Sequence, residues 1–196
     1  MSAWLRPRPE EIPPELRPLP FVLWRAEPRE DKPAKVPYCV AYPTRRASST
    51  DPSTWGTFDD AVEAYEALAD QRLDPVRGPV AGFGVVLTER AGITCIDLDR
   101  VIGVEGQLDT RAETIVERCD SWTEISPSGT GLHIFVRGAT VPALRGAQIE
   151  VYSDARYIAL TGHQWPGTPH TLRRRQPYLD HLRRVASQSR PAEGME

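Results

Sequence analysis

Apolar runs of strand length, separated by Gly, Pro, Ser and charged residues, recur along the chain. Runs bounded in this way are typical of strands that are buried on one or both faces. The predicted strands lie within residues 20–27, 82–101, 121–127, 131–138, 148–153 and 156–163, and 82–101 holds two of them, joined by a turn at 88–92. Residues 28–38 are expected to form a loop or hairpin turn, and residues 42–56 a long polar loop.

Apolar positions spaced three and four residues apart predict helices between these strands. Thr57 is followed three residues on by Asp60, and Thr110 by Glu113, which is the spacing of a capping box at the start of a helix. A last helix is predicted over residues 178–186. The residues expected on the buried faces are Phe58, Ala61, Val62, Tyr65, Leu68 and Ala69, then Ala112, Ile115, Val116 and Cys119, then Tyr178, Leu179, Leu182 and Val185.

The order of these elements predicts an α/β (α+β) fold in which helices cover one face of a sheet. The strict strand–helix alternation of a doubly wound fold is absent. A chain of 196 residues fits one domain with a real core. We expect a loose Pro-rich arm at 1–20, a folded domain at 21–186, and a flexible tail or linker stub at 187–196.

Two aspartates, Asp97 and Asp99, end the apolar run ITCIDL. Residues two apart in a strand point to the same side, so both carboxylates are expected on one face. Neighbouring carboxylates repel each other, and Mg²⁺ or Mn²⁺ would relieve that repulsion because both ions prefer oxygen ligands. Taken alone, the pair is more typical of a strand end that meets solvent or pairs with Arg100.

A turn of small residues, SPSGTG, lies between two predicted strands and includes Ser128, Gly129 and Thr130. Glycine permits the close backbone approach that an anion-binding loop needs. His133 follows in the next strand, on the face of Phe135 and opposite Leu132 and Ile134. The turn therefore predicts either a phosphate-binding loop with a histidine donor or a plain hairpin with a half-buried histidine.

Glu150 lies between Ile149 and Val151 in the middle of an apolar strand. A buried acid is costly unless it is paired, solvated or bound to a metal. Pairing with Arg156 across a hairpin is the structural alternative to a role as a metal ligand.

Charge is distributed unevenly along the chain. The net charge is −3, yet residues 137–190 hold nine Arg and three acids, a local balance of +6 that leaves −9 elsewhere. A basic C-terminal third suits a polyanionic partner or a solvated face. The three cysteines lack zinc-site spacing, and their odd, sparse number argues against a disulfide framework. No signal peptide or membrane span is apparent, so a cytoplasmic location is expected.

In combination, these motifs are far more specific than each is alone. DxD at the end of a strand, SGxGxH entering a strand, an acid flanked by apolar residues, and then RYxxxTG follow one another in that order. The combination resembles the archaeo-eukaryotic primase superfamily, in particular the bifunctional primase-polymerase catalytic domain of phages, plasmids and bacteria. The resemblance covers roughly residues 21–167 and includes KVPY and SSTDPSTWGTFDDAV upstream.

The resemblance implies a core with a mainly antiparallel, RRM-like sheet joined to an N-terminal α/β subdomain. It implies that Asp97, Asp99 and Glu150 hold two divalent metals, Mg²⁺ or Mn²⁺, although many relatives carry Asp at the third position. The residues from Ser128 to His133 would bind the incoming nucleotide, with His133 on its phosphates. Arg156 and Lys35 are further candidate triphosphate contacts.

The function implied is template-directed nucleotidyl transfer, as DNA primase and DNA polymerase, on a single-stranded DNA template with nucleoside triphosphates. A helicase or accessory domain outside this chain is a possible partner, and no membrane partner is expected. Candidate template contacts are Arg173, Arg174, Arg175, Arg183 and Arg184. The alternatives are a non-catalytic nucleic-acid-binding initiation module and a DxD sugar-nucleotide transferase.

Overall fold

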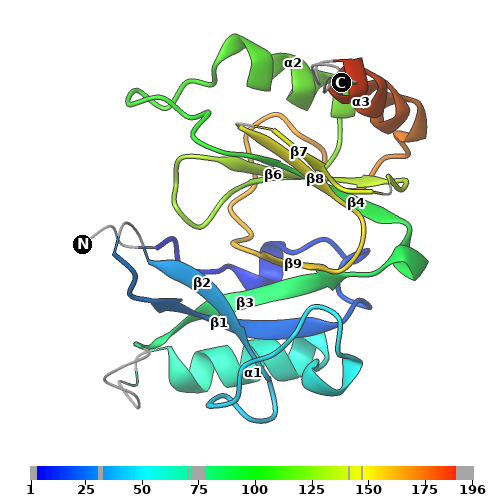
Figure 1. Ribbon diagram of the computed structural model, residues 1–196. Coiled ribbons are helices and arrows are strands. Elements are labelled where there is room, and N and C mark those ends of the chain that lie inside the picture. Colours follow the sequence, from blue (N-terminus) through cyan, green and yellow to red (C-terminus); the bar gives the residue numbers. More distant parts are fainter. Residues whose placement is uncertain are drawn as a thin grey trace, which may run out of the picture.

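The computed structural model describes residues 4–30, 33–69, 71, 78–140, 142–146 and 148–188. Two antiparallel sheets lie one above the other, with α1 on the outer side of one sheet and α2 and α3 on the outer side of the other (Figure 1). This arrangement confirms the predicted α+β class.

The first sheet has the strand order β2-β1-β3-β9 and the second sheet the order β5-β6-β4-β8-β7. The strands of the first sheet are β1 (Phe21–Glu27), β2 (Ala34–Tyr38), β3 (Val80–Leu87) and β9 (Arg156–Ala159). Those of the second sheet are β4 (Ile93–Leu98), β5 (Thr123–Ile125), β6 (Leu132–Arg137), β7 (Leu144–Arg145) and β8 (Ile149–Tyr152). The helices are α1 (Phe58–Leu68), α2 (Thr110–Cys119) and α3 (Gln176–Gln188), with short 3₁₀ turns at Pro9–Glu11, Pro52–Thr54 and Glu89–Ala91.

The two faces of the second sheet belong to different hydrophobic clusters. Cys95 and Phe135 pack in a cluster that includes residues of the first sheet and α1. Ile96, Leu98 and Ile134 pack against α2 and α3. We call the face of Cys95 and Phe135 the inner face, because it is turned toward the first sheet.

The helix predictions are largely confirmed. The Thr57 side chain accepts a hydrogen bond from the Asp60 backbone N–H, as its spacing predicted. The second helix is capped one residue earlier than expected, because Asp109 rather than Thr110 accepts from the Ala112 N–H. Val185 was predicted on the buried face of the last helix, but its side chain is 46% exposed, so that prediction was wrong.

The N-terminal arm is packed rather than loose, which corrects the expectation for its described residues. Ile12 and Leu16 are fully buried in the core. The Leu5 N–H donates to the Pro127 carbonyl and the Arg8 N–H to the Thr161 carbonyl. The arm therefore lies across two loops near the ends of β5 and β9. Residues 189–196 of the expected tail lie outside the described residues.

Candidate active site

Four of the titratable side chains discussed below lie in one row across adjacent strands of the second sheet. Asp97 on β4 is paired in register with His133 on β6 and with Glu150 on β8. His133 is paired in turn with Glu124 on β5. Residues directly opposite each other in a sheet project from the same face. Because Asp97 lies two residues from Cys95, the whole row projects from the inner face.

Asp99 lies just beyond the end of β4, where its N–H donates to the Gln148 carbonyl. The SPSGTG loop folds against this point. A side chain at Gly131 would collide with the Leu98 carbonyl, so glycine is what allows the loop to reach the strand end. The Ile102 N–H donates to the Thr130 carbonyl and fixes the two segments side by side. The structure thus brings the predicted loop next to the second aspartate.

Hydroxyl groups line that loop in a short chain. Ser128 Oγ lies 3.0 Å from Thr130 Oγ1 and 3.1 Å from Ser126 Oγ. Gly129 has a φ of +76°, which glycine adopts without strain. The exposed side chains of Ser128 and Thr130 are therefore available as hydrogen-bond donors beside Asp99.

His133 is buried, with a side chain only 2% exposed, and lies between two acids. Its Nδ1 is 2.9 Å from Glu124 Oε1, and its Nε2 is 3.7 Å from Asp97 Oδ1. A carboxylate accepts hydrogen bonds and cannot donate them, so the Nδ1 proton points to Glu124. The ring is consequently held with Nε2 toward Asp97.

Glu124 is the residue of this site that the sequence interpretation missed. Its side chain is fully buried, and its Oε2 accepts from the Thr161 N–H at 2.9 Å and the Gly162 N–H at 2.7 Å. The Thr-Gly of the RYxxxTG motif thus serves to bind this carboxylate. A weaker signal was present, because Glu124 is an acid inside a predicted strand, but only Ile125 of its two neighbours is apolar, whereas both neighbours of Glu150 are.

Glu150 is bound by two neighbours. Tyr152 Oη donates to Glu150 Oε2 at 2.8 Å, and the Arg156 guanidinium lies 3.6 Å from the same oxygen. Arg156 also stacks on the Tyr152 ring, 4.5 Å from its centroid. The Glu150–Arg156 pairing considered from the sequence does occur, but it joins the two sheets rather than the strands of a hairpin.

Electrostatics link Asp97 to the other charged side chains of the site. Burial raises the pKa of Asp97, the charge of His133 opposes that rise, and the negative charges of Asp99 and Glu150 add to it. Lys35 on β2 also lowers the pKa of Asp97, so it lies within electrostatic range from the first sheet. A bound cation would favour the ionised form of Asp97.

Among the described residues, no three acid, histidine or cysteine side chains already converge as a metal-ligand set. The donor chemistry nevertheless fits a hard divalent cation. Asp97, Asp99 and Glu150 supply only carboxylate oxygens, and Asp97 is largely buried beside like charges. Glu150 would have to turn from Tyr152 and Arg156 to join the other two.

The candidate arginines are divided among different surfaces. Arg183 and Arg184 are on α3, which covers the face of the second sheet opposite the acids. Arg175 pairs with Asp120 at 3.3 Å, and Arg173 lies 4.0 Å from the same carboxylate. The structure therefore places none of these four beside Asp97.

Comparison with known proteins identifies the family. No protein-family model matches the chain. In an alignment of 155 positions that covers 75% of the chain, it is 33% identical to a protein of Nitratiruptor phage NrS-1 named DNA primase-polymerase. The chain belongs to the primase-polymerase family. The aligned region spans 20% of that phage primase-polymerase, so the chain corresponds to about a fifth of it.

This family assignment agrees with the resemblance inferred from DxD, SGxGxH and the later motifs. In the part of the chain that is described, no helix has both the length and the apolar character needed to cross a membrane.

Proposed function

We propose that this primase-polymerase relative is a template-directed nucleotidyl transferase, with DNA primase and DNA polymerase activity on single-stranded DNA. The observation that carries the proposal is the row of Glu124, His133, Asp97 and Glu150 on adjacent strands, with Asp99 and the SPSGTG loop at its end. A row of three acids with a histidine, beside a glycine-containing loop, provides both ligands for a metal ion and hydrogen-bond donors for a phosphate.

Asp97, Asp99 and Glu150 are the residues that would hold Mg²⁺ or Mn²⁺. When bound, two such ions would lower the pKa of an attacking hydroxyl and offset charge on the attacking and leaving oxygens. Glu150 has a further role in the absence of an ion, since it pairs with Arg156 and keeps that guanidinium at the site.

The chain's own cations would hold the triphosphate. Because Glu124 accepts the Nδ1 proton, His133 would donate from Nε2 to a phosphate oxygen as the doubly protonated imidazolium. Arg156 and Lys35 approach from the first sheet, so the triphosphate would lie between the two sheets. Ser128 and Thr130 would add hydroxyl donors near Asp99.

In the proposed reaction, a 3′-hydroxyl attacks the α-phosphate of a nucleoside triphosphate. A phosphodiester bond forms, the bond to pyrophosphate breaks, and the hydroxyl proton leaves to solvent. Starting a strand without a primer requires a second nucleotide in place of the primer end. A helicase or accessory domain outside this chain would supply the single-stranded template.

Product formation from labelled nucleotides on single-stranded DNA, with and without a primer, tests this proposal. We expect extension of the primed template and short products on the unprimed one, in Mg²⁺ or Mn²⁺. Absence of product from both templates would reject nucleotidyl transfer. Product from the primed template alone would reject the priming half of the proposal.

A further inference from the structure

Residues 173–175 lie alongside the end of β6 in an extended conformation. Their three arginine side chains therefore alternate between two sides of the segment. The Arg137 N–H donates to the Arg173 carbonyl, and the Arg175 N–H donates to the Arg137 carbonyl. Arg173 and Arg175 turn to Asp120. Arg174, between them, forms a parallel β-bridge with Arg137, so the side chains of Arg137 and Arg174 lie on the same side.

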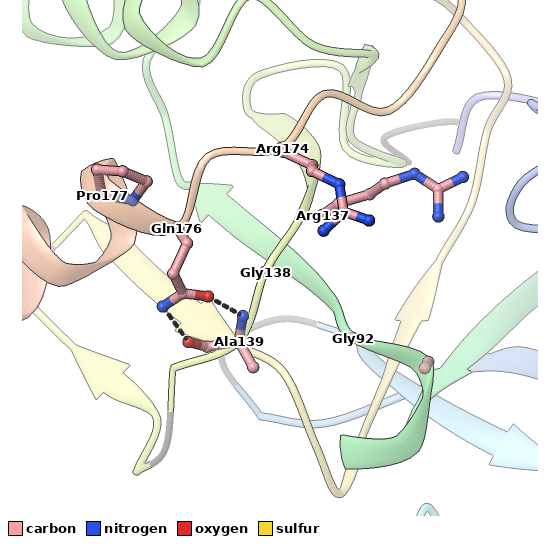
Figure 2. Close-up of a pocket in the computed structure, with 8 residues that line it drawn as sticks. Gly92, Arg137, Gly138, Ala139, Arg174, Gln176 and Pro177 are labelled. Carbon is pink, nitrogen blue, oxygen red and sulfur yellow. Dashed lines mark hydrogen bonds between the residues drawn. The ribbon is translucent and has the colours of Figure 1, made fainter.

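Arg137 and Arg174 line a cavity of about 650 Å³ at the start of α3. Figure 2 shows both guanidinium groups on the side of the cavity away from Gln176 and Pro177. Gln176 bonds through its side-chain amide to both the N–H and the carbonyl of Ala139, which fixes the opposite wall. The wall opposite the arginines is therefore held by two hydrogen bonds between a side chain and the backbone.

The two arginines have the properties of an anion site. Within the described part of the chain, neither side chain makes a hydrogen bond or an ion pair. Glu15 is near enough for Arg137 to lower its pKa, but Glu15 Oε1 accepts hydrogen bonds from Thr171 and Leu172 instead. Like charges paired in a sheet destabilise it, and an anion between them removes that cost.

The position of the cavity excludes the reacting nucleotide as its ligand. Arg137 is four residues from His133 on the same face of β6, which corresponds to about 13 Å. Phe135 and Trp122, both fully buried and 5.4 Å apart between ring centroids, fill the space beside that strand. A triphosphate bound at His133 therefore does not reach Arg137.

We infer that Arg137 and Arg174 bind a backbone phosphate of the single-stranded nucleic acid, away from the nucleotide being added. This inference rests on the proposed function, since it places the strand on the same protein. Guanidinium groups bind phosphate through charge-assisted hydrogen bonds, and such contacts position a strand without reading its sequence.

The test is the salt dependence of binding to fluorescently labelled oligo(dT), measured by anisotropy. Each phosphate contact contributes a slope of about −0.7 to the logarithmic plot of affinity against salt for a single strand. For Arg137→Gln, Arg174→Gln we expect weaker binding and a slope shallower by about 0.7 to 1.4, depending on whether one or two phosphates are bound. Arg174→Gln alone, at an exposed side chain, should give part of the change.

The matched control is Arg111→Gln, Arg118→Gln, which removes the same charge from exposed positions of α2. We expect the control to keep the wild-type slope, and the KM for nucleotide to stay unchanged in both double variants. An unchanged slope for the cavity variant in an enzyme that still incorporates nucleotide would overturn this inference alone. A raised KM with unchanged strand binding would assign the cavity to a nucleotide and also overturn it. A wild-type protein without nucleotide incorporation would instead reject the proposed function.

Discussion

Glu124 binds the backbone at Thr161 and Gly162, and it also orients the His133 ring. Substitution by alanine and by glutamine separates these two roles, because the two variants remove different contacts. Glu124→Ala leaves the Thr161 N–H, the Gly162 N–H and His133 Nδ1–H without their buried acceptor. An unsatisfied buried donor costs about 1–3 kcal/mol, and breaking a buried pair costs about 3–5 kcal/mol. We therefore expect Glu124→Ala to lower the free energy of unfolding by about 3–5 kcal/mol.

Glu124→Gln has the same shape and can keep the two backbone bonds through its amide oxygen. Its amide nitrogen then faces His133 Nδ1, which must become an acceptor, so the ring gives up its Nδ1 proton and is a neutral imidazole protonated on Nε2 alone. Hydrogen bonds to charged groups are worth about 1 kcal/mol more than neutral ones, so the expected loss of stability is about 1–3 kcal/mol. A neutral ring binds phosphate more weakly than an imidazolium, and a loss of about 1.4 kcal/mol in this contact should raise the KM for nucleotide about tenfold.

Urea unfolding measures the stability of both variants, and ¹⁵N chemical shifts of the His133 ring report which of its two nitrogens are protonated. If Glu124 only stabilised the fold, both variants would have a lower free energy of unfolding, but His133 Nδ1 would stay protonated in Glu124→Gln. The reasoning is refuted if Glu124→Ala unfolds within about 1 kcal/mol of the wild type, or if the ring proton in Glu124→Gln stays on Nδ1.

Two further predictions concern Asp97 and the glycine at which the SPSGTG loop meets the end of β4. Burial raises the pKa of Asp97, so the carboxyl group favours folding below its unfolded pKa of about 3.9, and this contribution is lost as the pH rises through the folded value. Without divalent ions, Asp97→Asn should therefore unfold at higher urea than the wild type at pH 7, a gain that disappears at pH 3; equal midpoints at pH 7 would contradict it. Gly131→Ala places a methyl group against the Leu98 carbonyl, so thermal unfolding should show a loss of about 1–3 kcal/mol and nucleotide incorporation should fall. The control is Gly146→Ala, because Gly146 also lacks a positive φ and a Cβ added there would come no nearer than 3.4 Å to Ile149.

Most of the strands and the three helices were predictable because their apolar periodicity is local, but β2 lies in the segment that was expected to form a loop or hairpin turn. The partners of each strand were not predictable in this way. β3 and β4 follow one another across a short turn, yet they belong to different sheets. The alternation of apolar and polar residues shows which side chains of a strand share a face, but it does not show which other strand pairs with it. β7, with two residues, is too short to produce a pattern at all.

The site was predictable to the extent that each residue interrupts an apolar pattern. Asp97 and His133 were found in this way, and the register then places them opposite each other. Glu124 interrupts a pattern equally, but its significance depends on Thr161 and Gly162, which come from a distant segment. Arg137 was missed because an arginine at the end of a strand is ordinary until Arg174 is placed beside it.

The most direct test of the central claim is the rate of single-nucleotide incorporation on a primed template by the Asp97→Asn, Asp99→Asn variant. A second variant, Asp59→Asn, Glu66→Gln, removes the same charge from exposed positions of α1 and serves as the control. The account predicts that the control retains the wild-type rate and that incorporation by the first variant falls by at least about a thousandfold, in keeping with the loss of metal-assisted charge stabilisation worth several kcal/mol. Incorporation by the folded Asp97→Asn, Asp99→Asn variant at the wild-type rate would contradict the assignment of the active site to the inner face of the second sheet.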